Sequence, residues 1–323
     1  MATETVPGAP VHNTVPVIAA AELDARTFRE EFLIPGLPVL IRGVAPPEQV
    51  FSIDAFHREM ARREVFVCEH GKLRGPKWQW SRYAYQYPLR VEEYLRMLAD
   101  GRAAERDIYM SFLRVGDIES AAAARRLLDE VAQRYGLQRL YPDMEGYLWI
   151  GPPGHVEPLH TDEGDNTLYQ VAGVKHFAIF PPDQLHNLYP FPLIGPLPPW
   201  VSQVDIDRPE PERFPRVHEA LARRHDVVLE PGDMIFLPTQ WSHEVTIVSG
   251  EPCISVNRQW KIAPWRRNFC TSRSTLWYLK RKLPRSFIIG AHALLARLRK
   301  PSDSLQYTSA LRRDQGRETK SSQ

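Results

Sequence analysis

The stretch from Gly154 to Gln184 constrains this chain more than any other, because it joins a metal-ligand pattern to strand-like residues. Its centre reads His160-Thr161-Asp162. Alternate side chains of an extended strand point to the same side, so His160 and Asp162 are predicted to face one point. An imidazole and a carboxylate at one point make two thirds of a 2-His-1-carboxylate triad, which holds non-haem Fe(II) and leaves positions open.

The third ligand of such a triad is expected on another strand, and His243 is the best candidate. It lies in the strand-like run GDMIFLPTQWSHEV, after a Gly-Asp turn. A His-x-Asp triplet alone arises by chance in many chains, so the prediction rests on the combination with His243. A structural histidine is the alternative interpretation of His243. The remaining histidines considered are predicted to be surface or loop residues: His155, His176, His186, His218, His225 and His292.

Lys175 stands out because it interrupts the apolar run VAGVKHFAIF. Lysine is seldom buried without a partner. A lysine in this setting therefore predicts a bound anion, held by a charge-assisted hydrogen bond. An exposed lysine at a strand edge is the alternative.

Further motifs extend this pattern over residues 15–264. They are HTD at 160–162, Asn166, Lys175, LYPFP at 188–192, VSQVDIDRPEPERFP at 201–215, EPGDMIFLPTQWSHEV at 230–245 and SVNRQW at 255–260. In order and approximate spacing, these motifs resemble the JmjC, or cupin-like, family of iron- and 2-oxoglutarate-dependent oxygenases. Within that family the likeness is greatest to the asparaginyl hydroxylase that inhibits hypoxia-inducible factor.

The resemblance implies a mainly β fold with flanking helices: a double-stranded β-helix, or jelly roll, of two antiparallel sheets. It implies Fe(II), 2-oxoglutarate as co-substrate and O2 as oxidant. The residues that it assigns to the metal are His160, Asp162 and His243. Those that it assigns to 2-oxoglutarate are Lys175, Tyr109, Asn166 and Asn257.

Three positions depart from the asparaginyl hydroxylase. Glu157 replaces a threonine that helps to bind the co-substrate, and its carboxylate would repel the distal carboxylate of 2-oxoglutarate unless it turns away. Thr161 replaces a tyrosine, and Ser111 replaces a glutamine that contacts the peptide substrate. These changes leave the oxygenase prediction intact and leave the substrate open.

The composition is that of a globular protein: of 323 residues, 43% are hydrophobic and 25% are charged. No apolar run is long enough to span a bilayer, and MATETVPGAP is unlike a secretory signal. Three scattered cysteines fit a reducing cytoplasm. The predicted domains are a flexible leader (1–14), the oxygenase domain (15–264), a basic helical C-terminal extension (265–300) and a disordered tail (301–323).

The periodicity of apolar residues predicts the main elements. Helices are expected at 20–32, 53–63, 91–100, 121–135 and 216–224. Strands are expected at 37–44, 65–70, 107–113, 145–151, 166–173, 175–182 and 251–262, in the ligand triplet and within 226–250. Gly173 is predicted to form a hairpin, 71–88 an aromatic-rich loop, and 183–226 a long insertion. Asn257 is expected on a strand that returns beside His243.

Charge is divided unevenly along the chain. Residues 261–323 carry 15 Lys and Arg against 3 Asp and Glu, whereas the preceding residues carry 26 against 36. The basic segment could pack on the acidic body, pair with a second subunit, or meet an anionic membrane or nucleic acid. The family resemblance implies a homodimer formed through the C-terminal helices.

The leading hypothesis is an oxygenase that hydroxylates a C–H bond of a protein or peptide side chain. The alternatives are a hydroxylase of a tRNA base or a small metabolite, a methyl-lysine demethylase, a metal cupin that uses no 2-oxoglutarate, and a non-catalytic cupin binding module. A binding module has no reason to keep metal ligands and a buried cation together.

Overall fold

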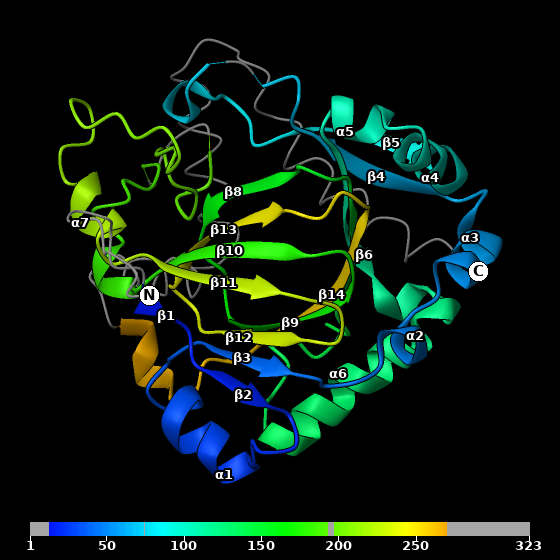
Figure 1. Cartoon of the computed structure of the whole chain (residues 1–323), viewed down its shortest axis with the longest axis horizontal. Helices are drawn as coiled ribbons and strands as arrows, with labels where there is room; N and C mark the ends of the chain where they lie inside the picture. The colour runs from blue at the N-terminus through cyan, green and yellow to red at the C-terminus, as the bar shows by residue number, and fades with distance from the viewer. Residues whose placement is uncertain (1–12, 74, 193–196, 270–323) are drawn as a thin grey trace, which may run out of the picture. The chain divides into compact units, whose positions relative to one another are not determined.

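The computed structural model describes residues 13–73, 75–192 and 197–269 (Figure 1). One compact unit ends at Arg267, and a second begins at Asn268. Nearly all of the predicted extension (265–300) and all of the predicted tail (301–323) lie outside the described residues. Residues 265–269 form a short 3-10 helix, η6 (Trp265–Phe269).

The described strands form two sheets, as the jelly-roll prediction requires. The larger sheet has nine strands, in the order β2 (Val17–Ala19), β3 (Val39–Arg42), β12 (Met234–Leu237), β9 (Asp165–Ala172), β14 (Cys253–Trp260), β7 (Tyr147–Gly151), β6 (Ile108–Arg114), β4 (Glu64–Glu69) and β5 (Tyr85–Arg90). The smaller sheet has five, in the order β1 (Asn13–Thr14), β11 (His225–Leu229), β10 (Lys175–Phe180), β13 (Ser242–Ile247) and β8 (Val156–His160), four of which lie side by side in Figure 1.

The two sheets enclose a core, and from β7 to β14 the chain passes between them at every step except from β10 to β11. One apolar cluster combines Phe177 and Ile179 of β10 with Ile235 of β12 and Val245 of β13. β10 and β13 belong to the smaller sheet and β12 to the larger one. The mainly β, jelly-roll prediction is confirmed.

The predicted hairpin at Gly173 is wrong. β9 pairs with β12 and β14, whereas β10 pairs with β11 and β13, so the turn at Gly173 carries the chain from one sheet to the other. Gly173 has a φ of 69°, which glycine adopts without strain. The expectation that Asn257 lies on a strand beside His243 is also wrong. Asn257 is on β14 of the larger sheet, whereas His243 is on β13 of the smaller sheet.

Most helices lie to one side of the barrel, where α3 to α6 appear at the right of Figure 1. The helices are α1 (Ala25–Thr27), α2 (Pro47–Val50), α3 (Ile53–Met60), α4 (Val91–Ala99), α5 (Arg102–Glu105), α6 (Ala122–Tyr135) and α7 (Val217–Leu221). Apolar residues of α6 join a core cluster with residues of the larger sheet, including Leu148 and Val256. As predicted, α6 ends at Gly136, which is left-handed. No helix among the described residues is both long and apolar enough to cross a membrane.

Three predicted boundaries differ from the structure. The leader (1–14) is not wholly loose, because its last two residues form β1 and pair with β11. The helix expected over 20–32 begins at Ala25 and continues as a π-helical turn, Phe28–Leu33. The loop expected over 71–88 ends in β5, whose residues alternate in burial and pair with β4.

Candidate active site

Strand pairing brings the two candidate histidines together. His160 ends β8 and lies opposite His243 of β13, with ring centroids 4.2 Å apart. Asp162 lies beyond the end of β8, so it does not face the site through strand alternation as predicted. Its oxygens are nonetheless 3.9 Å from Nε2 of each histidine. The structure therefore places the three predicted ligands around one point.

Both histidines are oriented by backbone carbonyls. His160 Nδ1 lies 2.7 Å from the Pro158 carbonyl, and His243 Nδ1 lies 3.0 Å from the Trp241 carbonyl. A carbonyl can only accept, so each Nδ1 must donate, which leaves each Nε2 lone pair for a metal. Burial first, and then the neighbouring His160, lower the pKa of His243 and keep it neutral.

A chain of amides holds the Asp162 carboxylate. Asn166 donates to it at 2.7 Å and Gln259 at 3.4 Å. Asn257 in turn donates to Asn166 at 3.1 Å, and Trp149 donates to Asn257 at 2.7 Å. Sequence reasoning missed Gln259, although it lies two residues after Asn257 on β14 and therefore on the same face.

Lys175 lies inside the barrel, with only 3% of its surface exposed. Its Nζ donates to Ser255 Oγ at 2.7 Å and to the Tyr109 hydroxyl at 3.5 Å. Burial lowers its pKa. Among the described residues no carboxylate forms an ion pair with Lys175, so its charge is available to an anion. Ser255 was not predicted, although it shares a face of β14 with Asn257.

Glu157 bonds partners other than Lys175, although its charge is near enough to raise the pKa of Lys175 against the effect of burial. Its carboxylate accepts a hydrogen bond from the Tyr83 hydroxyl and lies 3.4 Å from His155 Nε2. Burial opposes ionisation, but the hydrogen bond to His155 and the nearby histidines hold the pKa of Glu157 well below its ordinary value. Despite the substitution at this position, Lys175 has no carboxylate partner among the described residues.

His155 lies in the loop before β8, as one alternative of the prediction had it, but it is buried and not at the surface. Only 2% of it is exposed, and its Nδ1 lies 2.6 Å from Asp107 Oδ1. Sequence reasoning failed here because both partners of His155 come from the folded structure. His176 also has a partner, Asp226, at 2.7 Å. His186 and His218 are exposed as predicted, and His292 lies outside the described residues.

The cupin-like domain family matches residues 25–264. The chain belongs to the cupin-like family. This is the family of Fe(II)- and 2-oxoglutarate-dependent oxygenases expected from the sequence, and the grouped His160, Asp162 and His243 are the donor set that Fe(II) takes in such enzymes. The narrower likeness to the asparaginyl hydroxylase stays a prediction.

Named relatives of this cupin-like chain include two demethylases. Lysine-specific demethylase 8 of Xenopus tropicalis is 25% identical over 74% of this chain and 54% of its own length. The Danio rerio protein of the same name is 28% identical over 72% and 55%. Jumonji C domain-containing protein 5 of Drosophila melanogaster is 34% identical over 35% and 27%. This chain thus spans about half the length of the demethylase relatives.

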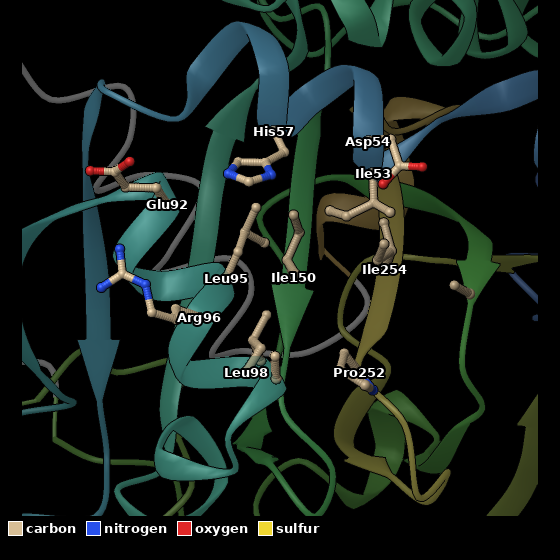
Figure 2. Close-up of a pocket in the computed structure, with 12 residues that line it drawn as sticks. Ile53, Asp54, His57, Glu92, Leu95, Arg96, Leu98, Ile150, Pro252 and Ile254 are labelled. Atoms are coloured by element: carbon tan, nitrogen blue, oxygen red, sulfur yellow. The ribbon is translucent and has the colours of Figure 1, made fainter.

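A pocket of about 660 Å³ lies outside the cupin-like barrel (Figure 2). Its lining includes apolar Leu95 of α4, Ile150 of β7 and Ile254 of β14, and charged Glu92 and Arg96. Because Ile150 and Trp149 are adjacent on β7, they point to opposite faces of the sheet. The pocket is therefore on the helix side of the larger sheet, away from the grouped ligands.

Proposed function

We propose that this chain is an Fe(II)- and 2-oxoglutarate-dependent oxygenase that hydroxylates a C–H bond on a protein or peptide side chain. The observation that carries the proposal is Lys175, a buried cation inside the barrel for which the described part of the chain offers no carboxylate partner. A triad alone would suit many metal cupins. A triad together with a fixed cation suits a co-substrate that chelates a metal at one end and carries a carboxylate at the other.

Each residue has a defined part in this proposal. His160 and His243 would hold the metal through Nε2, and Asp162 would hold it through a carboxylate oxygen. Lys175, with Tyr109 and Ser255, binds the distal carboxylate of 2-oxoglutarate. Asn166 and Gln259 keep the Asp162 carboxylate turned toward the histidines, and Asn257 fixes the amide of Asn166.

Bound iron supplies the redox chemistry: 2-oxoglutarate, O2 and a substrate C–H give succinate, CO2 and a C–OH. The protein contributes the orientation of its ligands and the neutral state of His243. Because the carbonyls of Pro158 and Trp241 occupy both Nδ1 atoms, the imidazoles need no rearrangement to bind a metal. Tyr109 and Ser255 give the distal carboxylate hydroxyl donors in a site from which water is largely excluded.

The test is succinate formation by anaerobically purified protein given Fe(II), 2-oxoglutarate and O2. Such enzymes often turn over 2-oxoglutarate without substrate, so no substrate has to be guessed. We expect succinate from the wild type and none from a His160→Ala/Asp162→Ala double variant. If the wild type makes no succinate and calorimetry detects no 2-oxoglutarate binding, the oxygenase proposal fails in favour of a binding module.

Demethylation of lysine is the second candidate, because two relatives carry that name. Hydroxylation of an N-methyl group gives a product that releases formaldehyde and the free amine. Formaldehyde formed in step with succinate from a methyl-lysine peptide would favour demethylation. A stable gain of one oxygen on a peptide, seen by mass spectrometry, would favour hydroxylation.

A further inference from the structure

A second group of metal-binding side chains lies apart from the one described above. We propose that His70, Asp107 and His155 form a separate divalent-cation site suited to Zn(II), with Glu157 as the carboxylate that orients His155. Two imidazoles and a carboxylate are a ligand set that Zn(II) accepts, with a water in the fourth position.

The three side chains come from separate segments that the barrel brings together. His70 follows β4, Asp107 precedes β6 and His155 precedes β8. The His70 amide donates to the Asp107 carbonyl at 2.9 Å, which joins two of these segments directly. One ligand atom from each residue lies within 4.8 Å of the other two.

The spacing is close to that of a zinc site. His155 Nδ1 and Asp107 Oδ1 are 2.6 Å apart. Ligands about 2.05 Å from a tetrahedral zinc lie roughly 3.3 Å from each other. Replacement of that hydrogen bond by a shared metal therefore needs the carboxylate to move by less than about 1 Å, which a side-chain rotation provides.

His70 supplies an independent sign of a missing ligand. Only 7% of it is exposed, yet neither ring nitrogen has a hydrogen-bond partner among the residues that the structure describes. A buried polar group without a partner is destabilising and rare in native proteins. A metal at this point would give one of the two ring nitrogens a partner.

Glu157 completes the arrangement expected around a zinc-bound histidine. With Nδ1 of His155 directed at Asp107, Nε2 faces Glu157 at 3.4 Å. A metal-bound imidazole commonly donates its other N–H to a carboxylate, which fixes the ring and strengthens the ligand. Tyr83 donates to the same carboxylate. A dication would also balance the two carboxylates of Asp107 and Glu157.

The proposed site is distinct from the His160, Asp162 and His243 group. The two groups share no residue, and His155 and His160 are separated by roughly 16 Å of extended chain. They are nevertheless connected, because the ring of Tyr109 packs on His155 with centroids 4.1 Å apart. A metal bound to His155 would therefore stabilise the position of Tyr109, whose hydroxyl bonds Lys175.

The experiment uses the full chain carrying His160→Ala and Asp162→Ala, so that the first group cannot hold zinc. The protein is stripped with EDTA, loaded with Zn(II), separated from free metal and analysed by mass spectrometry for zinc. We expect one zinc per chain, and loss of it when His70→Ala is added. His218→Ala, at an exposed histidine, is the matched control and should retain the metal.

Two further variants keep the proposal open to refutation. Asp107→Asn preserves shape and should also abolish binding, so it decides the case if circular dichroism shows that His70→Ala does not fold. Glu157→Gln should weaken zinc binding about 10- to 100-fold in competition with a chromophoric chelator. No zinc in the double variant, or zinc retained by both His70→Ala and Asp107→Asn, would overturn the proposal.

Discussion

At the scale of single residues, the charge of Lys175 remains available because Lys175 and the nearby Glu157 bond different partners. Lys175 bonds Ser255 and Tyr109, whereas Glu157 bonds Tyr83 and lies beside His155. A direct ion pair between Lys175 and Glu157 would consume the cation. The separate partners of Glu157 instead leave Lys175 for the co-substrate.

The first prediction concerns Lys175→Met, which keeps most of the side-chain volume and removes the charge. A hydrogen bond to a charged group contributes roughly 1.5–3 kcal/mol, so the Kd for 2-oxoglutarate should rise about 10- to 100-fold. Anaerobic calorimetry on the metal-loaded protein measures it. Lys261→Met, at an exposed lysine, is the control. An unchanged Kd for Lys175→Met would remove Lys175 from the proposed site.

The sequence was sufficient to predict the residues whose chemistry is unusual for their surroundings. A lysine in an apolar strand, and a histidine and an aspartate two residues apart, are visible without a fold. The contacts of His70, Asp107, His155 and Glu157 were not predictable, because these residues come from three chain segments that only the folded barrel joins. Their types alone are typical of any polar loop.

At the scale of elements, hydrophobic alternation predicted where the strands lie but not which strands pair. The run around Gly173 alternates on both sides of a glycine, which is the pattern of a hairpin. A crossing between two sheets has the same local pattern, because both need a turn with a positive φ. The choice depends on partners contributed by β12, β13 and β14, far along the chain.

The second prediction tests that turn with Gly173→Ala. The φ of 69° costs a residue with a Cβ roughly 1–2 kcal/mol. The added Cβ would also lie 2.8 Å from Ser249 Oγ and 3.0 Å from Cys253 Cα. We expect the free energy of unfolding, measured in urea, to fall by roughly 1–3 kcal/mol.

Gly250→Ala is the matched control for this change. Nothing lies within 4 Å of a Cβ built at Gly250. The unfolding free energy of Gly250→Ala should stay within about 0.5 kcal/mol of that of the wild type. Equal losses in the two variants would show that the Gly173 turn is not a special position.

The third prediction concerns the contact between β9 and η6. Asp165 is fully buried at the start of β9, and Arg267 of η6 donates to both of its oxygens. Burial raises the pKa of Asp165 to about 6, against the lowering effect of Arg267. The folded chain thus keeps a proton that the unfolded chain loses near pH 3.8. Stability contributed by this group should therefore fall as pH rises from about 4 to about 6.

The measurement is the unfolding free energy of wild type minus Asp165→Asn across that pH range. The difference should decline by roughly 3 kcal/mol between pH 4 and pH 7 and then stay level. Asp117→Asn, at an exposed aspartate, should show no such decline. A difference that rises with pH would mean that Arg267 outweighs burial.

At the scale of the whole molecule, the described barrel contains every residue that the proposed chemistry uses. The basic segment that follows it accounts for the charge asymmetry of the chain. The homodimer expected through the C-terminal helices concerns residues outside those that the structure describes. It stays a prediction, which light scattering on full-length and shortened chains can test.

The fourth prediction separates the barrel from the segment beyond it. A chain ending at Phe269 keeps Arg267, which bonds Asp165, the Leu33 carbonyl and the Ala263 carbonyl. It should fold and form succinate at a rate comparable with the full chain.

A chain ending at Pro264, the predicted domain boundary, loses Arg267 and leaves Asp165 buried without its cation. Removal of one partner of a buried ion pair costs roughly 3–5 kcal/mol, so this chain should unfold at markedly lower urea. Equal stability of the two chains would show that the barrel does not need η6. If the chain ending at Phe269 is unfolded, the barrel needs residues that follow Phe269.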